Sequence, residues 1–131
     1  MAGPAITPCP CGNSSGYAQC CAPLHAGTPA ADAERLMRSR YSAYVLKRED
    51  YLLSSWHAST RPASLQLATQ SPAPNWLGLS VKRHVPDGDR ATVEFLARVR
   101  YGGGKAQRLH ELSRFVREDG HWYYVDGDML G

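Results

Sequence analysis

The chain has 131 residues, of which 43% are hydrophobic and 21% are charged, and its formal net charge is +3. These values are typical of one ordinary globular domain with a small appendage. No stretch approaches the roughly 20 consecutive apolar residues of a membrane span, which excludes a transmembrane helix and a membrane partner.

All four cysteines lie near the N-terminus: Cys9 and Cys11 flank one residue, and Cys20 and Cys21 are adjacent. Residues 1–7 show no basic region followed by an apolar run, so we expect no signal peptide, a cytoplasmic location and reduced thiols. Four thiolates at this spacing are typical of a structural Zn²⁺ site. A disulfide or redox pair and a site without metal are the alternatives.

The surrounding segment supports the metal interpretation. Residues 1–31 contain no Asp, Glu, Lys or Arg and are rich in Gly, Pro, Ala and Ser, so they cannot bury enough apolar surface to offset their chain entropy. A structural zinc ion supplies folding free energy on the order of 10 kcal/mol in small peptides. His25 lies near enough to replace a ligand, although an ordinary loop histidine is the preferred interpretation. We predict a zinc-binding knuckle over residues 1–27.

A helical pattern follows, and residues 28–131 are predicted to form the main domain. Thr28 or Asp32 is a candidate N-cap, and apolar residues recur at three-to-four spacing over residues 33–45. Short helical segments are expected at residues 51–56 and near residues 62–67. The polar side of the first helix carries Arg35, Arg38, Ser39 and Ser42.

The hydrophobic period changes to two after residue 75. Alternation of apolar and polar residues predicts strands over residues 77–81, 93–101, 107–117 and 122–126, separated by Gly-containing turns. Helices followed by an antiparallel meander are typical of an α+β fold. We therefore expect helices that pack on a curved antiparallel sheet.

The last two predicted strands place polar side chains beside aromatic ones. A curved sheet over helices would gather them around one concavity, and polar groups that converge in an aromatic-lined pocket are typical of a small-ligand site. The alternative is a buried polar network, in which an acidic residue pairs with an arginine and with tyrosine hydroxyls. The candidate residues from the strands are Glu111, Ser113, Phe115, Trp122, Tyr124 and Asp126.

Several strings resemble known families. The run from Pro8 to Cys21 resembles the SEC-C zinc motif at the C-terminus of the SecA translocation ATPase. The strings LMRSRYSAY at residues 36–44, WH at 56–57, LHELSRFVR at 109–117 and WYYVDG at 122–127 resemble the YchJ family of uncharacterised bacterial proteins. This resemblance implies an N-terminal zinc knuckle, a cone-shaped domain like that of nuclear transport factor 2 (NTF2), and no established activity. It adds four pocket candidates from the helical side: Tyr41, Tyr44, Trp56 and His57.

The favoured function is a zinc-binding adaptor with a small-ligand pocket, because the similar segment of SecA contacts a chaperone and a closed four-cysteine site leaves no open metal position. The alternative is a small-molecule enzyme, with His57 and either Glu111 or Asp126 as general acid and base. No reaction can be named for it.

Nucleic-acid binding is disfavoured. A four-thiolate zinc site would carry −2 and reduce the net charge of +3 to +1, and the arginines of the predicted strands alternate between the two faces of the sheet. The outer face of the sheet is a candidate homodimer contact.

Overall fold

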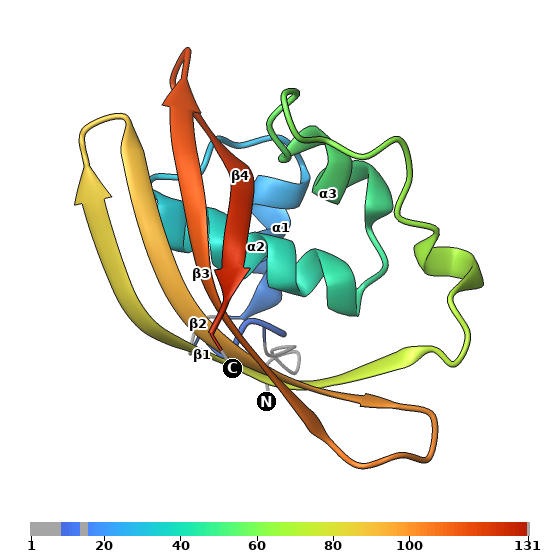
Figure 1. The fold of residues 1–131 in the computed structure, drawn as a ribbon. Helices are drawn as coiled ribbons and strands as arrows, with labels where there is room; N and C mark the ends of the chain where they lie inside the picture. Colours follow the sequence, from blue (N-terminus) through green and yellow to red (C-terminus); the bar gives the residue numbers. More distant parts are fainter. Residues whose placement is uncertain (1–8, 14–15, 131) are drawn as a thin grey trace, which may run out of the picture.

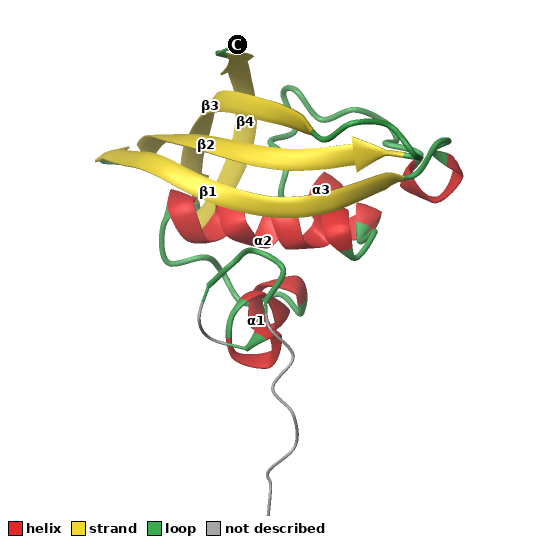
Figure 2. Ribbon diagram, turned by 90° about the horizontal axis from the view of Figure 1, so that it is seen from below, coloured by secondary structure: helices red, strands yellow, loops and turns green. Residues whose placement is uncertain are grey.

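The computed structural model describes residues 9–13 and 16–130. Its four strands form one antiparallel sheet in the order β1-β2-β3-β4, and the long helix α2 lies across the concave face of this sheet (Figure 1). Seen from below, α1 lies on the side of α2 that faces away from the sheet (Figure 2). The predicted α+β fold is therefore confirmed. No described helix is long and apolar enough to cross a membrane.

The N-terminal knuckle is built from turns and two short helical pieces. A 3-10 turn, η1 (Tyr17–Gln19), leads directly into α1 (Cys21–His25). The cysteine pair lies at the start of this helix, since Cys20 is the N-cap of α1 and Cys21 is its first residue. Residues 1–8 and 14–15 of the predicted knuckle lie outside the described part of the chain.

Helix α2 (Ala33–Val45) begins at Asp32, whose side chain accepts a hydrogen bond from the backbone N–H of Arg35 at 2.8 Å. Asp32 rather than Thr28 is therefore the cap, since it satisfies a backbone donor that the helix leaves free. The helix ends as predicted, and the left-handed residue Lys47 (φ 57°) turns the chain toward α3 (Glu49–Ser54).

A long connection follows α3. The prediction of helix near residues 62–67 is wrong, because only the 3-10 turn η2 (Leu67–Thr69) forms there. The carboxylate of Glu49 holds this connection instead. It accepts hydrogen bonds from the backbone N–H groups of Leu65 at 3.3 Å and Leu67 at 2.9 Å. These N–H groups therefore have a side-chain acceptor in place of the backbone acceptors of a helix.

The four strands are longer than the alternation pattern predicts: β1 (Pro74–Asp87), β2 (Arg90–Tyr101), β3 (Gln107–Glu118) and β4 (His121–Met129). Irregularities in register explain part of the difference. They occur in β1 beside Gly78 and Lys82, and in β4 opposite the step from Arg114 to Phe115. Such bulges increase local twist and curvature, which bends the sheet around α2.

The main core lies between the concave face of the sheet and α2, and it continues beyond α2 into the knuckle. Apolar residues of β2, β3 and β4 meet Leu36, Met37 and Tyr41 of α2, and the four cysteines join the same buried cluster. Helix α2 thus has the knuckle on one side and the sheet on the other.

Candidate metal centre and ligand cavity

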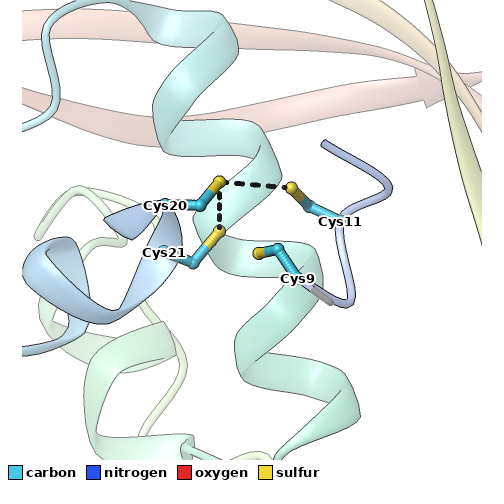
Figure 3. Close-up of side chains that lie close together, drawn as sticks. All are labelled: Cys9, Cys11, Cys20 and Cys21. Carbon is cyan, nitrogen blue, oxygen red and sulfur yellow. Dashed lines mark hydrogen bonds between the residues drawn. The ribbon is translucent and has the colours of Figure 1, made fainter. Parts of the chain in front are cut away.

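The four cysteines converge on one buried point beside α2. Figure 3 shows Cys9 and Cys11 on one loop, and Cys20 and Cys21 at the start of α1, with their sulfur atoms gathered together. The sulfur atoms lie within 4.8 Å of one another, with 3.7 Å between those of Cys11 and Cys20 and 3.9 Å between those of Cys20 and Cys21. Thiolates about 2.3 Å from a tetrahedral ion lie about 3.8 Å apart. The cluster can therefore hold a metal ion.

The pKa values of the cysteine thiols shift in different directions. The pKa of Cys11 is lowered to about 4, mainly because it is hydrogen-bonded to the Cys21 thiol, whereas that same bond raises the pKa of Cys21. Burial raises the pKa of Cys20 to about 11. A thiolate is the form of cysteine that binds metals, so the lowered pKa of Cys11 favours the form that can bind an ion.

Helix α2 contacts the cysteine cluster through the side chain of Ser42. The hydroxyl of Ser42 donates to the sulfur of Cys21 at 3.3 Å and lies 3.6 Å from the sulfur of Cys9. Donors of this kind orient thiolate ligands and tune their affinity for metal. Sequence reasoning placed Ser42 on the polar side of the helix but did not connect it with the cysteines.

Two arginines from the same side of α2 contact the knuckle backbone. Arg35 donates to the carbonyl of Cys20 at 3.3 Å and approaches its sulfur at 3.8 Å, and Arg38 donates to the carbonyl of Cys11 at 3.1 Å. The signal for this contact is the spacing of Arg35, Arg38 and Ser42, which lie on one helix face. Both halves of the knuckle are thereby attached to α2.

His25 is the last residue of α1 and is not part of the cysteine group. Its Nε2 is 2.8 Å from the carbonyl of Ser39, so this nitrogen carries the proton, and its Nδ1 accepts from the hydroxyl of Tyr17 at 2.7 Å. Burial lowers the pKa of His25, which favours the neutral ring. The histidine ties the knuckle to α2 rather than coordinating an ion.

A cavity of about 380 Å³ opens on the other side of α2, between this helix and the concave face of the sheet. Its walls are mostly aromatic and aliphatic, and besides tyrosine hydroxyls its polar side chains are those of Arg40, Gln70, Glu111 and Ser113. Seven of the ten predicted pocket residues line this cavity: Tyr41, Tyr44, Trp56, Glu111, Ser113, Phe115 and Tyr124.

The other three predicted residues lie elsewhere. His57 is bonded to Ser59 at 2.7 Å and to Glu118 at 3.0 Å, outside the cavity. Trp122 is on the helix-facing side of β4 but packs farther along it, where the guanidinium of Arg117 lies 5.4 Å from its ring centroid.

Asp126 is displaced by the irregularity in β4. Phe115 pairs with Tyr124, yet Arg114 pairs with Asp126, so Val125 is the extra residue. A one-residue shift moves a side chain to the opposite face, and Asp126 accepts from Arg114 on the exposed outer face at 2.6 Å. The expectation of one concavity shared by all six strand residues is corrected accordingly.

Sequence reasoning missed Arg40, the most buried charge of the cavity. Its side chain points between Trp56 and Tyr124, with the guanidinium carbon 4.9 Å and 4.6 Å from their ring centroids. Nη1 donates to the carbonyl of Leu52 at 2.8 Å and to the hydroxyl of Ser55 at 2.6 Å. The sequence signal was its spacing. Arg40 lies three residues after Met37 and four before Tyr44, which places it on the apolar face of α2.

Glu111 supplies the carboxylate of the cavity. It accepts a short hydrogen bond from the hydroxyl of Ser113 and a longer one from Tyr124 at 3.4 Å. Burial is the main cause that raises the pKa of Tyr124, so this tyrosine stays a protonated donor. Gly127 leaves the room that Glu111 occupies, because a Cβ atom at this position would lie 2.5 Å from its Oε2.

The arrangement separates the residues proposed for acid–base catalysis. Glu111 lines the cavity, whereas His57 and Asp126 lie outside it, and none of the described lining residues is a histidine. A general acid or base must reach the reacting group within hydrogen-bond distance. The described cavity thus offers binding groups without the predicted acid–base pair.

Comparison with known proteins places the chain in a family. Residues 32–127 match the family model for the YchJ middle NTF2-like domain. The chain belongs to the YchJ family. The resemblance inferred from the sequence strings is therefore confirmed, and the NTF2-like assignment covers the sheet, α2 and α3 of this YchJ-family chain.

Relatives of this YchJ-family chain extend over almost its whole length. It is 62% identical to a UPF0225 protein from Xanthomonas campestris pv. campestris over 120 residues, covering 91% of this chain and 92% of the relative. It is 55% identical to a UPF0225 protein from Polaromonas naphthalenivorans, covering 95% and 98%. These names state no activity, which agrees with the prediction of an uncharacterised family.

A solved structure also resembles this YchJ-family chain. The solution structure of a SEC-C motif containing protein from Rhodopseudomonas palustris superposes with a TM-score of 0.84 at 38% identity, and covers 94% of this chain and 98% of the other. The described cysteine cluster and this neighbour together support a SEC-C-like N-terminal segment. The boundary predicted between residues 27 and 28 stays a prediction.

Proposed function

We propose that this YchJ-family chain is a zinc-stabilised binding module whose cavity holds a compact, largely apolar organic molecule. The observation that carries the proposal is the cavity of about 380 Å³ with its aromatic lining and few polar groups. Small-molecule sites in proteins are clefts of roughly 300–1,000 Å³ with this character. A cytoplasmic location stays a prediction.

The knuckle has a structural role in this proposal. All four cysteines are buried, and a four-thiolate zinc site leaves no coordination position for a substrate. Zinc bound there would supply folding free energy rather than Lewis-acid chemistry. The chain's own residues orient the cysteines: Ser42 donates to a sulfur, and Arg35 and Arg38 hold the two loops.

Binding is favoured over catalysis because of the side chains that reach the cavity. Glu111 already accepts hydrogen bonds from two protein hydroxyls. Arg40 donates to one backbone carbonyl, that of Leu52, and to one side-chain hydroxyl, that of Ser55. These fixed groups are suited to hold a ligand in one orientation. The enzyme hypothesis loses its predicted acid–base pair, because His57 and Asp126 are not among the described lining residues.

The proposal is tested with a neutral fluorescent probe, N-phenyl-1-naphthylamine, and with native mass spectrometry of the purified protein. We expect probe fluorescence to rise in the wild type, one zinc per chain, and a co-purified small molecule. Leu109→Trp fills the cavity and should abolish probe binding. Leu112→Trp, on the opposite face of the same strand, is the matched control and should retain it. No probe binding and no bound molecule in the wild type would overturn the proposal.

A second candidate is the adaptor function predicted from the sequence. It is favoured by the exposed, uncharged surface of the knuckle, which includes Gly12, Ala18, Gln19 and residues 26–29. Apolar and neutral patches with few charges are typical of the centres of protein interfaces. Ala18→Glu would place a charge on this surface without touching the cysteines. A specific partner captured by the wild type and equally by Ala18→Glu would contradict the assignment of this surface.

A further inference from the structure

We infer that the ligand of the cavity is a monocarboxylate with an apolar, ring-sized body, and that its carboxylate binds Arg40. This inference rests on the proposed function, because it names the chemical class that the same cavity accepts. Three features carry it: a buried cation with no carboxylate in ion-pair contact, the free edge of its guanidinium, and the nearby negative charge of Glu111, which limits the ligand to one acidic group.

Arg40 is a buried cation without an acidic group in ion-pair contact. The residue is only 6% exposed, and no described carboxylate lies within the 4.0 Å of an ion pair to it. The charge of Glu111 acts on it only from a longer distance. A buried charge is costly unless a partner compensates it. Arginine also stays protonated inside proteins, so the cavity cannot avoid the charge by releasing the proton.

The guanidinium group has one edge available for a ligand. The rings of Trp56 and Tyr124 flank it, and Nη1 donates to Leu52 and Ser55. The described chain provides no hydrogen-bond acceptor for Nε or Nη2. This pair of donors matches the two oxygens of a carboxylate, which arginine binds through parallel hydrogen bonds. Because Arg40 lines the cavity, a bound acid can reach it.

Glu111 sets an upper limit on the ligand's negative charge. It lines the same cavity, and its Oε2 is held by the hydroxyls of Ser113 and Tyr124. Its charge acts on Arg40 from beyond ion-pair distance. Like charges repel strongly where water is scarce. The acid of the ligand therefore lies at Arg40, and the part of the ligand that faces Glu111 must be neutral. Dicarboxylates and polyphosphates do not fit this pattern.

The walls define the rest of the ligand. Trp76 forms ring contacts with Tyr41 and Tyr44, each at 5.7 Å between centroids, and Phe95 and Phe115 face them from the sheet. Aromatic walls favour flat, apolar surfaces through stacked and edge-to-face contacts. The ligand body is thus aromatic or of similar shape and polarity.

Three probes of nearly equal size test the inference in the wild-type zinc-loaded protein: 2-naphthoate, 2-naphthamide and naphthalene-2,6-dicarboxylate. Affinities are measured by quenching of tryptophan fluorescence and by calorimetry at pH 7.5 and constant salt. We expect 2-naphthoate to bind about tenfold or more tightly than the amide, because charge-assisted hydrogen bonds are roughly twice as strong as neutral ones. The dicarboxylate should bind more weakly than the monocarboxylate.

Two variants assign the effect to residues. Glu111→Gln removes the repelling charge and should improve the dicarboxylate several-fold while changing the amide little. Arg40→Met should bring the acid and the amide to about equal affinity, with circular dichroism and zinc content as checks on folding. If Arg40→Met does not fold, the wild-type series and Glu111→Gln still decide the question.

The outcomes separate the two levels of the proposal. Equal or tighter binding of 2-naphthamide than of 2-naphthoate would overturn the carboxylate inference and leave the binding function standing. Failure of all three naphthalenes together with the neutral probe N-phenyl-1-naphthylamine would overturn the binding function itself. Unchanged discrimination against the dicarboxylate in Glu111→Gln would contradict the role of Glu111.

Discussion

The two faces of α2 face different environments. On one face, Arg35, Arg38 and Ser42 contact cysteine sulfurs or knuckle carbonyls. On the other, Arg40 and Tyr44 border a cavity of about 380 Å³. The first face is filled by the chain itself around the cysteine cluster, whereas the second borders a cavity.

This contrast indicates that the two faces of α2 have different roles. The knuckle face contributes stability, because its polar groups have partners within the protein. In the proposed function the cavity face contributes recognition, because Arg40 has no carboxylate in ion-pair contact among the described residues and both its hydrogen bonds come from Nη1. Variants on each face should therefore change different measurements.

The largest effect is expected from Cys20→Ser. Loss of one ligand should greatly weaken zinc binding, and in zinc-finger peptides that binding is worth on the order of 10 kcal/mol. The measurement is zinc content together with calorimetric unfolding and hydrogen exchange, in which residues 16–27 should lose protection. An unchanged unfolding temperature would show that α2 holds the knuckle without a metal ion.

Ser42→Ala tests the support that α2 gives to the metal centre. The hydroxyl contacts two sulfurs, and loss of such partners typically lowers metal affinity 10- to 100-fold. Zinc affinity is measured by competition with a colorimetric chelator. Ser39→Ala is the control, because Ser39 bonds Leu36 and Tyr51 instead and should leave zinc affinity unchanged. Equal effects of the two variants would contradict this support.

Gly127→Ala tests the cavity face. The added methyl group would collide with Glu111 and displace it from Ser113, at a cost of about 1–3 kcal/mol as for other overpacked sites. Urea unfolding and probe affinity should both change, with zinc content unaffected. Gly103→Ala, where nothing lies near an added Cβ, should stay within about 0.5 kcal/mol of the wild type. Equal stability and equal probe affinity of the two variants would show that Gly127 does not limit the space of the Glu111 side chain.

The smallest effect is expected from pH and His25. Burial lowers its pKa in the folded state, while the unfolded value is about 6.5. The stability contributed by the neutral ring is therefore complete above about pH 6.5, and it is lost as the pH falls toward the lower folded pKa. Between pH 7.5 and 5.5, the wild type should lose more unfolding free energy than His25→Gln, by about 1 kcal/mol or less. Parallel pH profiles would contradict this assignment.

The sequence was most informative where chemistry depends on local spacing. The four cysteines could be grouped from their positions alone, and the alternating strands predicted the sheet. Asp126 was predicted on the wrong face, because the extra residue Val125 moves the side chains that follow it to the opposite face of β4. The alternation of apolar and polar residues does not reveal this bulge. Arg40 was missed because an arginine on an apolar helix face reads as a surface charge until its aromatic neighbours are known.

The crowding of α2 has a consequence for how this chain tolerates change. Eight of its 13 residues are buried, and those include side chains committed to the knuckle and others committed to the cavity. An ordinary surface helix keeps a broad solvent-facing side on which substitutions are nearly neutral. In a saturation mutagenesis experiment, α2 should therefore accept fewer substitutions per position than any hairpin turn of the sheet, and rare permissive sites should cluster at exposed helix ends.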